Sequence, residues 1–213
     1  YGADALRMTL CSMAAQGRDI KLSGQRVEGY RNFITKIWNA IKFCEINECK
    51  NLGLDITQSK NTFNVWILNE LDTCERSVSL AIKNYKFNDA ANTLYKFTWN
   101  IFCDWYIEFS KSVFYSNNEE DKQETRNTAS YVLTKLMIML HPIMPFITEH
   151  LWQEIDFIND KSSNKIIHAS WPKIDLPVKK NNKDADKLIQ IISAIRSTRA
   201  ELNVPVKSMI DIK

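Results

Sequence analysis

Residues 88–115 read NDAANTLYKFTWNIFCDWYIEFSKSVFY, and this stretch decides the fold. Its nine aromatic residues are spread so widely around a helix that no single stripe contains them. A helix that is apolar on all sides lies at the centre of a bundle, where neighbouring helices cover it. We therefore predict one helix over residues 88–115 at the centre of an all-α helical bundle.

Two carboxylates interrupt this aromatic stretch. Asp104 and Glu108 lie one helical turn apart, and a carboxylate pair is one of the arrangements used in general acid–base catalysis. An acidic side chain in a bundle core is more often paired with a neighbouring Arg, Lys or hydroxyl group. We therefore interpret both as structural links, and we predict no catalytic residue in this chain.

Helical spacing of apolar residues continues on both sides of this stretch. It predicts further helices over residues 4–15, 23–48, 61–85, 119–140, 146–155 and 184–202. Ser23 is suited to cap the N-terminus of its helix. The sequence HPIMP at residues 141–145 must interrupt the helical run, because each proline lacks an amide donor and disfavours helix at the preceding residue.

Two segments fall outside the bundle. Residues 158–183 are polar and contain two prolines, so we predict a connector with a short extended piece at residues 165–169. Residues 184–213 then begin a small trailing α/β subdomain, which is incomplete here. Its helix is followed by the start of a strand at residues 206–213.

The composition limits the class of protein. The 213 residues are 45% hydrophobic and 25% charged, with only five Gly and five Pro, which is typical of a helical globular protein and excludes disordered and fibrous chains. No window of eighteen consecutive apolar residues and no secretory leader occur, so we expect a cytoplasmic protein that does not span a membrane. The chain begins at Tyr1 without a Met, which suggests a piece of a longer polypeptide.

Cysteine and histidine are too sparse and too scattered for a metal site. None of the five cysteines lies two residues from another, and none of the three histidines has a His four residues away or an adjacent Cys. No glycine-rich phosphate loop occurs either. We therefore expect a reduced chain without metal, cofactor or catalytic nucleophile. We also expect it to be monomeric.

Charge is distributed unevenly. Residues 1–50 carry a net charge of +3, residues 51–178 of −4 and residues 179–213 of +4. Basic ends around an acidic middle are compatible with a local polyanion contact, which depends on clustered Lys and Arg rather than on net charge. Solvated helix faces explain the same pattern, so both interpretations stay open.

The helix predicted over residues 23–48 has a polar stripe opposite its apolar face. The stripe consists of Glu28, Asn32, Lys36, Asn39 and Phe43. An aromatic ring beside amides and a Lys is suited to stacking on an unpaired base and to hydrogen bonds with its edge, while Lys36 is suited to a phosphate. Packing of Phe43 under the loop at residues 48–59 or on a neighbouring helix is the alternative.

Several motifs resemble a known family. The opening YGADALR (1–7) and GRDI (17–20) resemble class I aminoacyl-tRNA synthetases of the valine, isoleucine and leucine group, and the remaining motifs are similar to the bacterial valyl-tRNA synthetases. These are RVEGYRNF (26–33), KIWNA (36–40), WIL (66–68), FCDWYIE (102–108), LHPIMPFITE (140–149), LW (151–152), SWP (170–172), IR (195–196) and RAELNVP (199–205). Their order covers nearly the whole chain.

The resemblance implies an anticodon-binding domain fragment. Residues 1–22 would be the tail of the stem-contact segment, 23–157 the helical bundle that binds the anticodon arm of valine tRNA, 158–183 the connector and 184–213 the start of the trailing subdomain. By similarity, tRNA contacts map to Lys36, Asn39, Lys42 and Phe43. The parent would be an ATP-dependent valine–tRNA ligase whose catalytic domain is another partner, and this piece alone would be inactive.

The sequence departs from the family pattern at two places, and two other interpretations of the chain stay open. The family usually has Arg at the position of Lys42, and Lys lacks the planar bidentate geometry of Arg. The family tends to carry Asp-Arg where this chain has Asn64-Val65, so any ion pair or tRNA contact there is missing. The same module of an isoleucyl or leucyl enzyme, or a helical protein-interaction scaffold, would also fit the pattern.

Overall fold

The computed structural model describes residues 1–15, 17, 19–154, 165–174, 183–205 and 208–209. The described residues are helical or irregular and contain no strand, which confirms the all-α prediction for this part of the chain. Two compact units are formed, Tyr1–Lys179 and Lys180–Lys213. The domain boundaries expected from the resemblance stay predictions.

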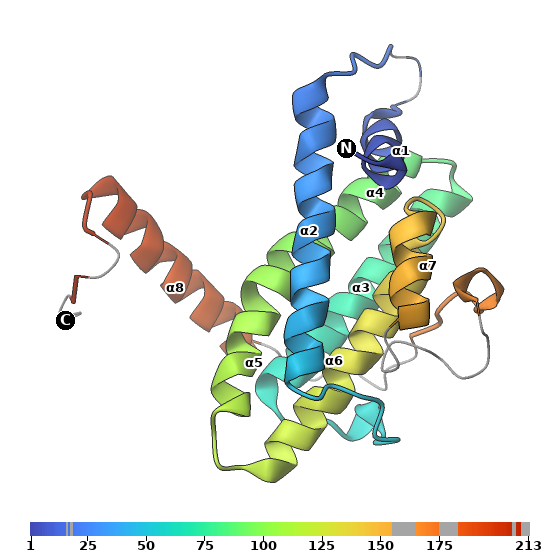
Figure 1. Cartoon of the computed structure of the whole chain (residues 1–213). Coiled ribbons are helices and arrows are strands. Elements are labelled where there is room, and N and C mark those ends of the chain that lie inside the picture. The colour runs from blue at the N-terminus through green and yellow to red at the C-terminus, as the bar shows by residue number, and fades with distance from the viewer. Residues whose placement is uncertain (16, 18, 155–164, 175–182, 206–207, 210–213) are drawn as a thin grey trace. The chain divides into compact units, whose positions relative to one another are not determined.

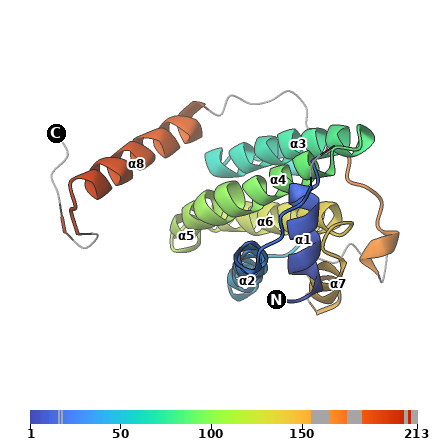
Figure 2. The same cartoon turned by 90° about the horizontal axis from the view of Figure 1, so that it is seen from above.

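The first unit is a bundle of long and short helices (Figure 1). Its elements are α1 (Ala3–Met13), α2 (Gly24–Ile46), η1 (Ile56–Gln58), α3 (Thr62–Lys83), α4 (Phe87–Lys96), η2 (Phe97–Tyr106), α5 (Ile107–Phe114), α6 (Glu119–Leu140), α7 (Pro145–Glu154) and η3 (Ile166–His168). Seen from above, α3 lies on one side, α1, α2 and α7 lie on the other, and α4, α5 and α6 lie between them (Figure 2). The helix predictions are confirmed with small shifts at their ends.

The aromatic stretch forms the middle of this bundle, as predicted, but it is not a plain α-helix. Elements α4, η2 and α5 follow one another without a break, and η2 is a π-helix. The wider turn is visible at Ile107, whose backbone N–H donates to the carbonyl of Phe102, five residues earlier. The rings of Phe97, Phe102 and Tyr106 are fully buried. π-Turns inside helices are frequent at functional sites.

Side-chain caps explain where three of the helices begin. The Ser23 hydroxyl accepts the backbone N–H of Arg26 at the start of α2, as predicted, and the Asn118 side chain accepts the N–H of Asp121 at the start of α6. Asn61 does the same for α3. Such caps satisfy amide donors that have no partner within the helix.

A buried polar cluster joins α3, η2 and α6. The Asn64 amide is 1% exposed and donates to Glu124 Oε1 at 2.9 Å and to Thr125 Oγ1 at 3.0 Å. Its carbonyl oxygen accepts from the hydroxyl of Tyr106 at 2.9 Å, and burial raises the pKa of Tyr106 well above its usual value. Asn64, one of the two residues at which the chain departs from the family, is therefore held in the core by side-chain hydrogen bonds.

The proline-containing turn ends α6 at Leu140 and starts α7 at Pro145, which confirms the predicted break. Two side chains of α1 hold this region. Arg7 donates to the carbonyl of Ile143 at 2.9 Å, and the buried carboxylate of Asp4 accepts the N–H of Ile147 at 2.6 Å. The first helix is therefore attached to the start of α7.

The C-terminal part of the chain contains one short 3-10 turn and one long helix among its described residues. Residues 165–169 are not a plain extended piece, because Ile166–His168 form one 3-10 turn closed by a backbone hydrogen bond from Ala169 to Ile166. The second unit contains α8 (Lys183–Glu201), close to the predicted helix. Most of the predicted strand at residues 206–213 lies outside the described residues.

Candidate nucleic-acid interface

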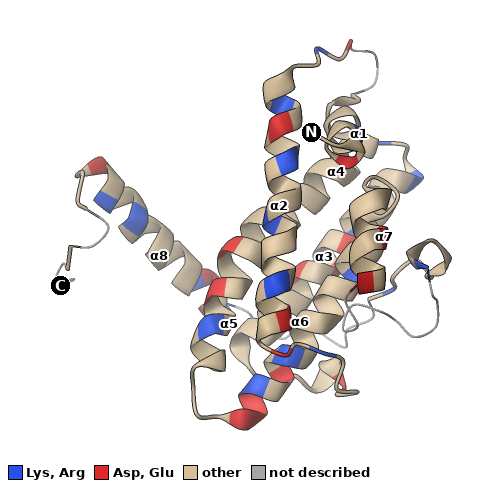
Figure 3. Cartoon of the chain, in the orientation of Figure 1, with Lys and Arg blue, Asp and Glu red and all other residues tan. Residues whose placement is uncertain are grey.

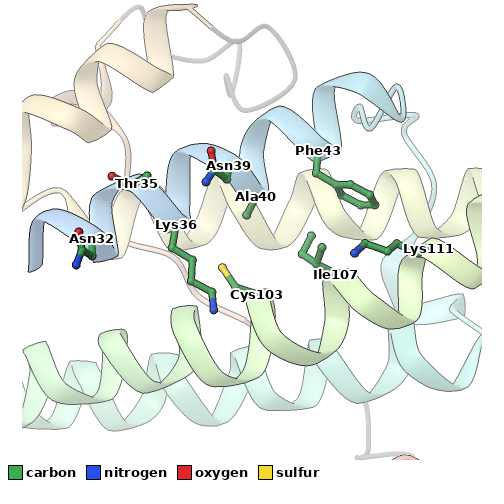
Figure 4. Close-up of a pocket in the computed structure, with 9 residues that line it drawn as sticks. All are labelled: Asn32, Thr35, Lys36, Asn39, Ala40, Phe43, Cys103, Ile107 and Lys111. Carbon is green, nitrogen blue, oxygen red and sulfur yellow. The ribbon is translucent and has the colours of Figure 1, made fainter. Parts of the chain in front are cut away.

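A groove of about 550 Å³ runs between α2 and the η2–α5 segment (Figure 4). It is lined by Asn32, Thr35, Lys36, Asn39, Ala40, Phe43, Cys103, Ile107 and Lys111. One wall thus contains four members of the polar stripe predicted on the second helix, whereas the fifth, Glu28, lies outside the groove and is paired with Arg31 at 3.6 Å. The other wall comes from the central aromatic segment, where residues 103, 107 and 111 follow one another at intervals of four.

Lys36 lies at the centre of the groove and is already paired. Its ammonium forms a hydrogen-bonded ion pair with the carboxylate of Asp104, and it lies 4.3 Å from the centre of the Trp99 ring. The Lys36 side chain is 28% exposed and that of Asp104 is 42% exposed. The predicted pairing of Asp104 with a basic neighbour is confirmed, although the pair is half-exposed rather than deep in the core.

Phe43 lies at the other end of the groove and is half-buried. Its ring centre is 6.0 Å from that of Phe114 at an angle of 46°, and the Lys111 ammonium lies 5.9 Å from it. The ring therefore packs on a neighbouring helix and lines the groove at once, so parts of both predicted alternatives are present. Lys111 is paired with Glu108 at 2.6 Å, so this second carboxylate has a basic partner as predicted, but the pair lies at the surface within α5 and not in the core.

The ridge of α2 beside the groove presents amides to solvent. Asn32 and Asn39 are exposed, and within the part of the chain that the structure describes neither amide makes a hydrogen bond. Lys and Arg recur along the same helix, which has four of them against two Glu (Figure 3). Free amides and a basic helix are what hydrogen bonding to an unpaired base and its backbone requires.

Lys42 does not line this groove, unlike the other three residues selected by similarity. Its ammonium is paired with Glu45 at 2.7 Å and lies 5.3 Å from the centre of the Trp38 ring. Trp38 in turn stacks on His150 of α7, with the ring centres 5.9 Å apart and the planes 6° from parallel. The structure therefore brings Lys36, Asn39 and Phe43 together and places Lys42 on a different flank of α2.

The thiols near the groove are unsuited to nucleophilic chemistry. Burial raises the pKa of Cys103 to about 12, and a hydrogen bond with Cys49 together with burial raises the pKa of Cys44 well above its usual value. Protonated, buried thiols are poor nucleophiles. Among the described residues no cluster of His, Cys, Asp or Glu is arranged to hold a metal ion.

Sequence reasoning missed the second wall of the groove. Cys103, Ile107 and Lys111 lie on a helix that the sequence marks only as apolar, and the fold alone brings them opposite the polar stripe. Their spacing of four residues is a signal that could have suggested a common face.

None of the helices in the described parts of the chain is long and apolar enough to cross a membrane.

Two comparisons with known proteins both find similarity to tRNA ligases. A family described as the anticodon-binding domain of tRNA ligase matches residues 64–213, and this match contains one wall of the groove but not α2. The chain is also similar to three bacterial proteins, each named valine–tRNA ligase, over a region that covers α2. They are those of Mesorhizobium japonicum (45% identical over 206 residues, 96% of this chain), Rhizobium meliloti (46% over 210 residues, 98%) and Agrobacterium fabrum (46% over 206 residues, 96%). The chain spans about 22% of the length of each.

Proposed function

Because the chain belongs to the family of anticodon-binding domains of tRNA ligases, we propose that it binds the anticodon arm of valine tRNA. It would do so as the tRNA-recognition module of a longer valine–tRNA ligase in the cytoplasm. The observation that carries the proposal is the groove between α2 and η2–α5, which combines an aromatic ring, free amides and basic side chains. Unpaired RNA bases are recognised by this combination.

In this proposal Phe43 stacks on one unpaired base of the anticodon loop. Its ring lines the groove and contacts Phe114, with the Lys111 ammonium 5.9 Å from the ring centre, so a stacked base would join an existing aromatic contact. Asn39 is placed on the same helix to donate to and accept from the edge of that base or the next. Lys42, on the other flank of α2, would meet RNA only where the loop continues around the helix.

The chemistry of valine attachment belongs to other parts of the parent protein in this proposal. The described residues supply no activated nucleophile or metal cluster near the groove. The chain spans about 22% of the length of its relatives, and in this proposal the rest of the parent binds ATP and valine while the 213-residue chain acts by recognition.

The test is binding of the purified chain to short RNA hairpins with the stem and loop of a valine tRNA anticodon arm. Affinity should fall when the anticodon bases are replaced and the stem is kept, because base contacts carry the specificity. It should also fall steeply with salt, because Lys and Arg that neutralise phosphates release counterions. Equal affinity for all anticodon replacements would contradict recognition of the anticodon.

A further inference from the structure

Both basic side chains that line the groove are paired with carboxylates of the η2–α5 segment. Lys36 is paired with Asp104 and Lys111 with Glu108. Asp104 itself is not one of the residues that line the groove. Its contact with the groove is through Lys36, whose ammonium it holds beside the Trp99 ring.

A neutralised Lys differs from a free one in what it can bind. A free ammonium near RNA displaces condensed counterions and contributes about 0.7 to the slope of log affinity against log salt for a single strand. An ammonium that is paired with a carboxylate must leave it before it can bind a phosphate. It then exchanges one anionic partner for another, so it contributes little to that slope. It nevertheless keeps hydrogen-bond donors, because an ammonium has three and Asp104 takes one.

We propose that Asp104 is a positioning residue that makes Lys36 a reader of base edges instead of a phosphate anchor. This inference rests on the proposed function, in which the groove takes an unpaired base. The ligand group that Lys36 would bind is an acceptor on the base edge, a carbonyl oxygen or a ring nitrogen. The role differs from the phosphate contact that the position of Lys36 on the polar stripe suggests.

The geometry supports this assignment in two ways. The ammonium is held from two sides, by the Asp104 carboxylate and by the aromatic face 4.3 Å away, so its position in the groove is defined before RNA arrives. The Lys36 side chain is only 28% exposed, so most of its surface is already covered by protein. A donor fixed within a groove discriminates between bases better than a mobile charge does.

The experiment compares Asp104→Asn with the unsubstituted chain, using the valine hairpin and hairpins with single anticodon replacements at several salt concentrations. Asn keeps the shape of Asp but removes the charge, so Lys36 becomes free to neutralise a phosphate. The slope should become steeper by about 0.7, which is about a threefold larger loss of affinity over a fourfold rise in salt. The preference among anticodon replacements should become smaller.

Glu120→Gln provides the matched control. It removes one carboxylate and frees one Lys, as Asp104→Asn does, but Glu120 is paired with Lys60 at 3.8 Å and neither lines the groove. Its slope and base preference should equal those of the unsubstituted chain. A steeper slope in both variants would mean that net charge alone causes the effect, and would contradict the proposal.

Lys36→Ala gives a second readout that does not depend on the folding of the Asp104 variant. The proposal expects weaker discrimination among anticodon replacements with an unchanged salt slope. If Lys36→Ala instead weakens all hairpins equally and lowers the slope by about 0.7, Lys36 is a phosphate anchor and the proposal is wrong. If the unsubstituted chain binds no hairpin at low salt, the proposed function itself fails, and the inference fails with it.

Discussion

Truncation of Phe43 separates its two roles, because packing and stacking have different signatures. Complete burial of a Phe makes its replacement by Ala cost about 3–5 kcal/mol of unfolding free energy. Phe43 is half-buried and has one ring neighbour, Phe114, so Phe43→Ala should cost about half of that, or about 2 kcal/mol. For a protein of this size the melting temperature should fall by about 2–4 °C for each kcal/mol.

The effect on RNA binding should be separate from this loss of stability. Loss of one aromatic stacking partner weakens binding of single-stranded RNA by about 1–3 kcal/mol per base, which is about 5-fold to 150-fold. The assay is fluorescence anisotropy with a labelled valine hairpin, at a temperature where circular dichroism shows the variant to be folded. Affinity is then expressed per folded molecule.

Phe63→Ala is a suitable control for Phe43→Ala. Phe63 is also half-buried and stacks on Phe109 with ring centres 4.1 Å apart, but it does not line the groove. Its truncation should lower the melting temperature and leave the affinity unchanged. If Phe43→Ala behaves in the same way, with lower stability and full affinity, then Phe43 packs and does not stack on a base.

Three further predictions concern other parts of the chain. The purified chain should show no valine-dependent exchange of pyrophosphate into ATP, and measurable exchange would contradict the assignment of catalysis to the rest of the parent. Asn64→Ala should lower the unfolding free energy in denaturant titrations by about 1–3 kcal/mol, because it leaves the Tyr106 hydroxyl and Glu124 with fewer partners. An unchanged denaturant midpoint would show that the polar cluster does not stabilise the fold. Because burial raises the pKa of Cys103 to about 12, its thiol stays protonated from pH 7 to 9, and iodoacetamide should modify it only on unfolding; rapid alkylation of the folded chain, seen by peptide mass spectrometry, would contradict this.

The helices were predictable because local signals and packing agree. The helix Glu119–Leu140 has the predicted ends, since Asn118 caps one end and the HPIMP sequence stops the other. The π-helical turn of Phe97–Tyr106 was not predictable, because the wider hydrogen bonding depends on how neighbouring helices pack against large rings. Periodicity indicated most of one wall of the groove, and the spacing of Cys103, Ile107 and Lys111 places them on one face of their helix, but only the fold shows that this face lies opposite α2.

The sequence also does not show which residues of different helices are paired. The sequence indicates that Asp104 should have a basic partner, but it does not indicate that the partner is Lys36, 68 residues away. It also groups Lys42 with the groove residues, whereas the ring of Trp38 and the carboxylate of Glu45 hold its ammonium on another flank. The contact between Lys36 and Asp104 therefore needs the three-dimensional arrangement, whereas both partners of Lys42 lie within about one turn of it on α2.

The central claim is that anticodon bases enter the groove between α2 and η2–α5. The most direct measurement is photo-crosslinking of a valine hairpin that carries 4-thiouridine at one loop position at a time, followed by mass spectrometry of the crosslinked peptides. The account predicts crosslinks in residues 32–43 of α2 and 103–111 of η2 and α5 when the base lies in the anticodon. Crosslinks confined to other helices, such as α7 or α8, with none in these two segments would contradict it.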